Sequence, residues 1–301
     1  MTGKVNHNKG TIQKPVSQKK KLFILADAGC ETGFAQVSHN LIEHLFDKYD
    51  IHVLAINYSG DPHPIQSKAK LYNPTARVHG DYYGLNRMNE LMMMLKPEAV
   101  MIINDPWVAS ENYGEFMENY RGVKLLYTPV DAENVKQEYI DKLTTFDQII
   151  AYTEFGKQQL SRFGLETPID VIPHGVNTKL YKPMSRVEAR ARNGFPVDWF
   201  VINITDRNSF RKRIDLGFYY FSEWVKQHKE DERIKIHYHG AMHDVGYDLF
   251  DLADQLGIKE RLIITAPNIT AQTGLPLELM PVVYGVADVG LSTTSGEGLS
   301  I

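Results

Sequence analysis

Short apolar runs alternate with segments of helical periodicity along most of this chain, and no other feature restricts the possible folds as strongly. A run such as residues 21–26, which ends at Asp27, predicts a buried strand. The segment after it repeats apolar residues at the spacing of one helix face: Phe34, Val37, Leu41 and Leu45. Strand, helix and strand in repeated order predict a parallel sheet that helices cover on both faces, which is an α/β fold.

The alternation occurs in two halves of the chain. The first half has predicted strands at residues 21–26, 51–56, 99–103, 123–127 and 148–152, and the second has them at 200–204, 234–238, 261–265 and 288–292. Between the halves, Pro, Gly and Asn interrupt regular structure in residues 171–183. At 301 residues the chain is long enough for two domains, which we place at residues 21–172 and 173–301. Because the second half has fewer predicted strands, we expect the C-terminal domain to be incomplete.

The helices expected in the second half are defined by their apolar positions. Residues 215–228 form one of them, and its predicted packing residues are Leu216, Tyr219, Tyr220 and Trp224. Residues 249–256 and 277–286 are the other two helices expected there.

Residues 1–20 differ from the rest of the chain because they are basic and contain little that a core would bury. No acidic residue precedes Asp27, whereas six lysines do. We interpret the segment as a disordered, solubilising tail, with contact to nucleic acid or another anionic surface as the alternative.

Several segment types are missing from the sequence. The tail lacks the apolar core of a signal peptide, and no stretch of 18 apolar residues predicts a membrane span. The single cysteine, Cys30, has no partner for an internal disulfide, so we expect a cytoplasmic protein.

A glycine-bearing loop follows the first predicted strand. Gly29 and Gly33 lie between that strand and the first helix, where backbone N–H groups approach a ligand closely. Gly33 is therefore a candidate ligand-binding residue, and a simple tight turn is the alternative. The spacing is not that of a dinucleotide-binding motif, and the chain has no phosphate-binding loop of the nucleoside triphosphatase type.

Four cations crowd the loop after the first strand of the second half: Arg207, Arg211, Lys212 and Arg213. Ligands of open α/β sheets bind at this end of the strands. Fixed cations there stabilise negative charge that develops on a leaving diphosphate. A solvated basic turn is the alternative.

These motifs, taken together, resemble those of GT-B glycosyltransferases, in particular the retaining family 4 group. The linker Pro173-His174-Gly175-Val176-Asn177, continued by Tyr181-Lys182-Pro183, resembles a segment that joins the two domains of those enzymes. The glycine loop, the Arg207 and Lys212 pair, and Ser295-Gly296-Glu297-Gly298 follow in the family's order. The resemblance implies two Rossmann-like domains that face a cleft.

The resemblance also implies roles for the donor-side residues. Arg207 and Lys212 would bind the diphosphate of a nucleotide-diphospho-sugar such as a UDP- or GDP-sugar, while Arg211 and Arg213 would face outward. Glu297 would contact hydroxyls of the transferred sugar, and Gly33 and Gly298 would lie against the donor. The family has a second glutamate eight residues after the first, which this chain lacks, and Leu299 and Ser300 already depart from its pattern. We therefore expect a chain truncated within this signature.

The N-terminal domain would hold the acceptor. Many relatives carry a histidine after the fourth strand, which is absent here, and Asp131 is the nearest polar candidate. Asp105 and Trp107, after the preceding strand, offer a carboxylate and a stacking ring. The alternatives are turn capping for the two aspartates and core packing for Trp107.

No metal or other cofactor is expected. His237 and His239 share one side of a strand, but no further ligands complete a zinc spacing. The chain also lacks an Asp-x-Asp motif, which argues against a metal-dependent GT-A transferase.

Two functions follow from the sequence. The first is retaining glycosyl transfer from a nucleotide-sugar to an acceptor that the sequence does not identify. The second is a catalytically inactive remnant that binds nucleotide-sugars or acts as an interaction module. Missing strands would leave a sheet edge open to self-association.

Overall fold

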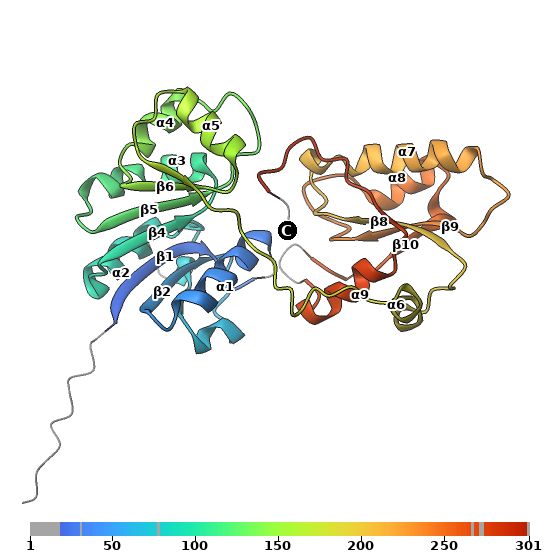
Figure 1. The fold of residues 1–301 in the computed structure, drawn as a ribbon, viewed down its shortest axis with the longest axis horizontal. Helices are drawn as coiled ribbons and strands as arrows, with labels where there is room; N and C mark the ends of the chain where they lie inside the picture. The colour runs from blue at the N-terminus through green and yellow to red at the C-terminus, as the bar shows by residue number, and fades with distance from the viewer. Residues whose placement is uncertain (1–18, 31, 77–78, 266–267, 271–273, 300–301) are drawn as a thin grey trace, which may run out of the picture.

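The computed structural model describes residues 19–30, 32–76, 79–265, 268–270 and 274–299. Two parallel sheets, each between helices, form two side-by-side domains and confirm the α/β prediction (Figure 1). The basic tail lies outside the described residues, apart from its last two positions. The domain limits stated above stay predictions.

Seven described strands form the first sheet, in the order β3-β2-β1-β4-β5-β6-β7. They are β1 (Lys20–Asp27), β2 (Tyr49–Ile56), β3 (Lys70–Tyr72), β4 (Ala99–Ile103), β5 (Val123–Thr128), β6 (Gln148–Ala151) and β7 (Ile169–Val171). The two edge strands β3 and β7 were not predicted, because three residues are too few to show a periodicity. Since all neighbours are parallel, the carboxyl ends of β1, β4 and β5 meet at one edge of the sheet.

Helices cover both faces of this sheet. They are α1 (Gly33–Leu45), α2 (Leu85–Leu95), α3 (Pro106–Asn119), α4 (Gln137–Leu143) and α5 (Glu154–Arg162), with short 3-10 turns η1 (Pro64–Ser67) and η2 (Pro74–Ala76). One core lies under α2, α3, α4 and α5, and a second lies under α1 and η1. Alternate residues of β1 serve the two cores: Phe23 and Leu25 face the first, and Leu22 and Ile24 face the second. This explains why β1 reads as one continuous apolar run.

The described strands of the second sheet are four, in the order β10-β9-β8-β11. They are β8 (Phe200–Thr205), β9 (Ile234–His239), β10 (Leu262–Ile264) and β11 (Val289–Gly290). The helices are α6 (Arg186–Asn193), α7 (Ile214–Lys226), α8 (Leu249–Gln255) and α9 (Met280–Gly285), with 3-10 turns η3 (Phe210–Lys212), η4 (Lys259–Arg261) and η5 (Leu277–Leu279). Helices α7 and α8 cover one face, and α6 and α9 the other (Figure 1). Self-association through an edge of this sheet stays a prediction.

The buried face of α7 differs in part from the prediction: Trp224 packs against the core as predicted, but the two tyrosines do not. Tyr219 and Tyr220 are 46% and 56% exposed, whereas the core-facing apolar residues are Ile214, Phe218, Phe221 and Val225. Gly217 fixes this orientation, since a Cβ there would lie 2.9 Å from Cδ1 of Ile204 in β8. The helix rotates so that its glycine faces the sheet, and the two tyrosines turn toward solvent.

Two short segments form a contact between the domains, which we call the seam: residues 129–131 after β5, and residues 296–299 after β11. A Cβ on Gly296 would lie 2.7 Å from the carbonyl oxygen of Asp131, and one on Gly298 would collide with Pro129. Nε2 of His174 lies 3.0 Å from the carbonyl oxygen of Leu299. The two glycines therefore let the domains meet backbone to backbone.

Among the described helices, none combines the length and apolar character that crossing a membrane would require.

Candidate functional site

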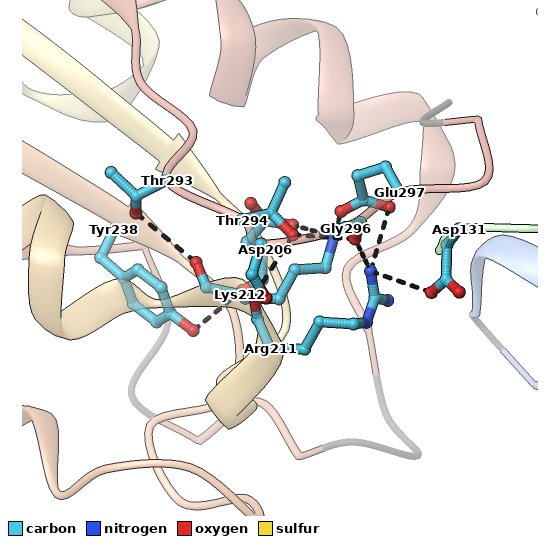
Figure 2. Close-up of polar contacts among 10 residues, drawn as sticks. Asp131, Asp206, Arg211, Lys212, Tyr238, Thr293, Thr294, Gly296 and Glu297 are labelled. Carbon is cyan, nitrogen blue, oxygen red and sulfur yellow. Dashed lines mark hydrogen bonds and ion pairs between the residues drawn. The ribbon is translucent and has the colours of Figure 1, made fainter. Parts of the chain in front are cut away.

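The loop after β8 and the loop after β11 meet at the carboxyl edge of the second sheet (Figure 2). Lys212, at the end of η3, lies between two carboxylates. Its Nζ is 2.6 Å from Oδ1 of Asp206 and donates a hydrogen bond to Oε1 of Glu297. The structure thus brings two of the predicted site residues, Lys212 and Glu297, into direct contact.

This contact sets the charge state of both carboxyls. Burial raises the pKa of Asp206, although the hydrogen bond and charge of Lys212 counteract it. Burial also acts to raise the pKa of Glu297, but the Lys212 hydrogen bond and the charges of Lys212 and Arg211 lower it overall. Glu297 is therefore ionised at neutral pH and neutralises a cation that a ligand phosphate would need.

Hydroxyl groups and backbone fasten the two loops together. Oγ1 of Thr293 donates to the carbonyl of Arg213 at 2.7 Å, and the N–H of Ser295 donates to the carbonyl of Arg211 at 2.9 Å. The Ser295 hydroxyl donates to the same carbonyl at 3.0 Å. These bonds hold Glu297 opposite Lys212, because only one residue separates Ser295 from Glu297.

Arg211 extends from the same turn across the seam, which corrects the prediction that it faces outward. Its Nη1 lies 3.6 Å from Oδ2 of Asp131 and 3.6 Å from Oε2 of Glu297, and it donates to the Gly296 carbonyl (Figure 2). Arg213 instead forms an ion pair with Asp215 at 2.9 Å within its own domain. The left-handed backbone of Arg213 (φ 50°) turns the chain into α7 and separates the two side chains.

Arg207 makes its ion pair elsewhere. Its Nε and Nη2 donate to the two carboxylate oxygens of Asp244 at 2.5 and 3.0 Å. The hydrogen bond with Asp244 raises the pKa of Arg207. Burial raises the pKa of Asp27, at the end of β1, and the hydrogen bonds from Thr32 and Asn57, followed by the charge of Arg207, partly offset that rise. Arg207 therefore lies near enough to the end of β1 for its charge to favour the ionised form of Asp27.

On the N-terminal side, three adjacent strands each have a carboxylate at or just beyond their carboxyl end: Asp27 is the last residue of β1, Asp105 follows β4 and Asp131 follows β5. Burial first, and the neighbouring charge of Asp131 second, raise the pKa of Asp105 to about 7, despite the opposing effect of Arg211. Asp105 precedes α3, but its side chain makes no capping bond to that helix. Trp107 is half-buried and packs against the core of this domain.

The glycines divide into packed and open positions. A Cβ on Gly29 would collide with the ring of Tyr58, so that glycine is needed for packing. At Gly33, the first residue of α1, a Cβ would meet no atom within 4 Å. The backbone before Gly33 is held by Thr32, which binds Asp27 at 2.7 Å and caps α1 through Ala35 at 3.1 Å. Gly298, which we predicted to lie against the donor, lies at the seam.

The histidines of β9 are sheet residues. Nε2 of His237 lies 2.7 Å from Oγ1 of Thr265, and its ring packs edge-on against Phe195. Burial lowers the pKa of His237 to about 4, so it is neutral at pH 7. Within the described ranges, no group of three or more His, Cys, Asp or Glu side chains has the arrangement of a metal site.

Sequence reasoning missed Asp206, Asp244 and the contacts of Arg211 across the seam. Asp206 had a usable signal, since it directly follows the first strand of its half, as Asp27 ends the first strand of the other. Asp244 had none, because it lies 37 residues from Arg207.

Comparison with known proteins supports the fold. No protein-family model and no curated protein matches the sequence. A sucrose-phosphate synthase from Thermosynechococcus elongatus superposes with a TM-score of 0.67 at 14% identity, over 94% of this chain and 77% of that one. Anabaena HepE, solved in complex with UDP-glucose, gives 0.65 at 12% identity, over 93% and 75%. WaaG, a glycosyltransferase involved in lipopolysaccharide biosynthesis, gives 0.65 at 12% identity, over 91% and 75%. The chain has the GT-B fold of these proteins.

Proposed function

We propose that this protein transfers a sugar from a nucleotide-diphospho-sugar to an acceptor hydroxyl, with retention of the anomeric configuration. The observation that carries the proposal is the convergence of Lys212, Arg211 and Glu297 from two loops at one sheet edge. A site for a sugar diphosphate needs cations for the phosphates and a carboxylate for the sugar hydroxyls. The solved structures that share the GT-B fold include one bound to UDP-glucose, which supports a nucleotide-sugar donor.

The cations would act on the leaving group. As the bond between the sugar and the diphosphate breaks, negative charge grows on the β-phosphate, and fixed positive groups stabilise that charge most in the transition state. Lys212 supplies a point charge, and Arg207 supplies a planar fork suited to phosphate oxygens. No metal ion is part of this proposal.

The acceptor hydroxyl would attack the anomeric carbon from the face that the diphosphate leaves. One carbon–oxygen bond breaks, a new one forms to the acceptor oxygen, and the hydroxyl proton passes to an oxygen of the departing diphosphate. No protein nucleophile is required. Glu297 would hold the sugar by accepting hydrogen bonds from its hydroxyls.

The N-terminal domain would bind the acceptor. Asp105 and Asp131 lie on the far side of the seam from Lys212, and Arg211 reaches toward them. A carboxyl with a pKa of about 7 exchanges protons readily at neutral pH, which suits a group that hydrogen-bonds an acceptor hydroxyl. Trp107 stays a candidate for stacking against the acceptor.

The proposal is tested by incubating the protein with UDP-, GDP- and ADP-sugars and measuring free nucleoside diphosphate. A Lys212→Gln variant should lose at least tenfold in release rate, because one fixed cation is removed. The matched control is Lys226→Gln, which removes the exposed lysine paired with Glu223 on α7. It should behave like the unaltered protein.

The remaining outcomes separate transfer from binding. Thermal stabilisation by a nucleotide without release of nucleoside diphosphate would contradict glycosyl transfer. It would support the second function considered above, a protein that binds nucleotide-sugars without catalysis. If no donor gives either release or stabilisation, both functions are refuted.

A further inference from the structure

Asp244 and Arg207 form an ion pair in which the carboxylate is buried and the guanidinium is exposed. The Asp244 side chain is 5% exposed, whereas the Arg207 side chain is 60% exposed. Asp244 accepts from both Nε and Nη2, so it holds the guanidinium at two points. The hydrogen bond from Arg207 lowers the pKa of Asp244, which stays ionised although it is buried.

The loop that carries Asp244 is itself fixed to the loop that carries Arg207. Asn208, next to Arg207, is fully buried. Its Nδ2 donates to the carbonyls of Met242 at 3.0 Å and Tyr247 at 2.7 Å, and its Oδ1 accepts from the Tyr247 N–H at 3.0 Å. The N–H of Gly246 donates to the Asn208 carbonyl at 3.1 Å. The backbone on both sides of Asp244 is therefore bound to the residue that follows Arg207.

Glycines allow this close approach. A Cβ on Gly240 would collide with the carbonyl oxygen of Asp206, and one on Gly246 would collide with the Asn208 side chain. The hydroxyl of Tyr238 also donates to the Asp206 carbonyl at 2.9 Å. Residues 206–208 and 240–247 thus form one rigid unit, which we call the paired loops.

Burial costs the Asp244 carboxylate hydration free energy, and its attraction to an exposed partner offsets this cost only in part. The pair therefore contributes little to the stability of the fold. What the pair does provide is a fixed guanidinium. An arginine has five N–H donors, and Asp244 takes two of them, which leaves three on the exposed side. A pre-ordered fork binds an anion without the loss of rotamer entropy that a free arginine would incur.

We propose that Asp244 is a positioning residue, which orients Arg207 so that the free edge of its guanidinium binds the diphosphate of the donor. This inference rests on the proposed function, since it assumes a diphosphate ligand. The Asn208 amide and the paired loops transmit the rigidity of β8 and β9 to Asp244, and Asp244 passes it to Arg207. Asp244 itself touches no ligand.

The direction in which one substitution changes the affinity for an anion separates this role from a purely electrostatic one. Asp244→Asn removes a negative charge near the anion site, so charge alone predicts tighter binding of an anion. Positioning predicts weaker binding, because Arg207 becomes free to rotate, and the rotamer entropy of an arginine corresponds to roughly a tenfold change in affinity. The two mechanisms thus predict opposite shifts.

The experiment measures the Kd of inorganic pyrophosphate by calorimetry for the full chain and its variants. We expect Asp244→Asn to raise Kd, by less than the roughly tenfold that lost orientation alone would cause, because removal of the charge acts in the opposite direction. The matched control is Asp231→Asn, because Asp231 holds Arg233 by the same two-point contact, at 2.8 and 2.9 Å, before the start of β9. That variant should bind like the unaltered protein. In an Arg207→Lys background, Asp244→Asn should no longer raise Kd, since lysine cannot form the two-point contact and only the loss of the negative charge, which favours anion binding, remains.

A second measurement needs no variant of Asp244. Nitrogen relaxation of the arginine Nε–H groups should show Arg207 more ordered than Arg192, which is 56% exposed and pairs with Glu188. An Arg207 as mobile as Arg192, or an Asp244→Asn protein that binds pyrophosphate as tightly as the unaltered chain or more tightly, would overturn the positioning role. The proposed function would then still stand on release from the donor panel. Absence of pyrophosphate binding by the unaltered chain, together with no release, would overturn both.

Discussion

Replacing Glu297 by glutamine should increase the affinity for a nucleoside diphosphate but not the affinity for its sugar conjugate. The Glu297 carboxylate contacts Lys212 and lies 3.6 Å from Nη1 of Arg211. A diphosphate that binds these cations must displace or share this internal anion. Glutamine keeps the shape of the side chain and removes the charge, so UDP should bind more tightly.

The magnitude follows from the local charges. Lys212 and Arg211 face three carboxylates, those of Asp206, Glu297 and Asp131, so the cluster carries one net negative charge. A unit charge 4 Å away contributes about 1 kcal/mol in water and about 4 kcal/mol at an effective dielectric constant near 20. Because a quarter of the Glu297 side chain is exposed, we take a value near the lower end, about 1.4 kcal/mol, which is tenfold in Kd.

UDP-glucose should respond differently because Glu297 would also accept hydrogen bonds from the sugar. Hydrogen bonds to a charged group contribute about 1.5–3 kcal/mol. Their loss would cancel or outweigh the gain on the phosphates. The ratio of the Kd for UDP-glucose to the Kd for UDP should therefore rise by at least tenfold in Glu297→Gln.

Calorimetric titration of both ligands against both proteins measures this ratio, with Glu223→Gln as the control. Glu223 pairs with Lys226 on the exposed face of α7, so its replacement should leave both affinities unchanged. Equal weakening of UDP and UDP-glucose in Glu297→Gln would show that Glu297 only supports the loop, and the reasoning above would be wrong.

Three further changes test other parts of the structure. Asp105→Asn should stabilise the protein by about 4 kcal/mol at pH 8 but not at pH 4, because the folded-state pKa is raised from 3.8 to about 7 and each pKa unit corresponds to about 1.4 kcal/mol. The stability of the unaltered protein should therefore fall as pH rises from 4 to 7, which urea melts measure. Gly298→Ala should separate the domains and increase the radius of gyration in X-ray scattering, whereas Gly290→Ala, with open space at its Cβ, should not. Asn208→Ala should cost about 3 kcal/mol of unfolding free energy, because it leaves buried backbone groups unpaired.

The fold was largely predictable because its central strands are buried on both faces. Strands such as β1 and β2 read as continuous apolar runs, and their predicted positions agree with the structure. The face of α7 was not predictable from apolarity alone. Tyrosine is apolar along its ring, so Tyr219 and Tyr220 suit a helical stripe as well as Phe218 and Phe221 do. Contact of Gly217 with β8 decides between them, and that contact is tertiary.

The site was predictable in its parts but not in its pairings. Position after a strand identifies Lys212 and Glu297 as candidates, because parallel strands collect such residues at one edge. Which cation of the basic turn reaches the seam depends on backbone angles within η3 and at Arg213, and three adjacent basic residues carry no period that would reveal these angles. The pairing of Arg207 with Asp244 depends on the register of β8 with β9, which sets Thr205 beside His239 and brings the loops together.

Donor binding should be coupled to domain movement, because the same segment, residues 296–298, takes part in both. Residues 296–298 carry the anion that neutralises Lys212, and the glycines on either side of Glu297 form the seam with residues 129–131. A diphosphate that binds Lys212 must displace the Glu297 carboxylate or share the cation with it, and Ser295 is fastened to the turn that carries Lys212. A displacement would therefore fall on residues 296–299 and change how the two domains meet. Arg211, which contacts both Glu297 and Asp131, would move toward the bound diphosphate, and its contact with Asp131 would weaken.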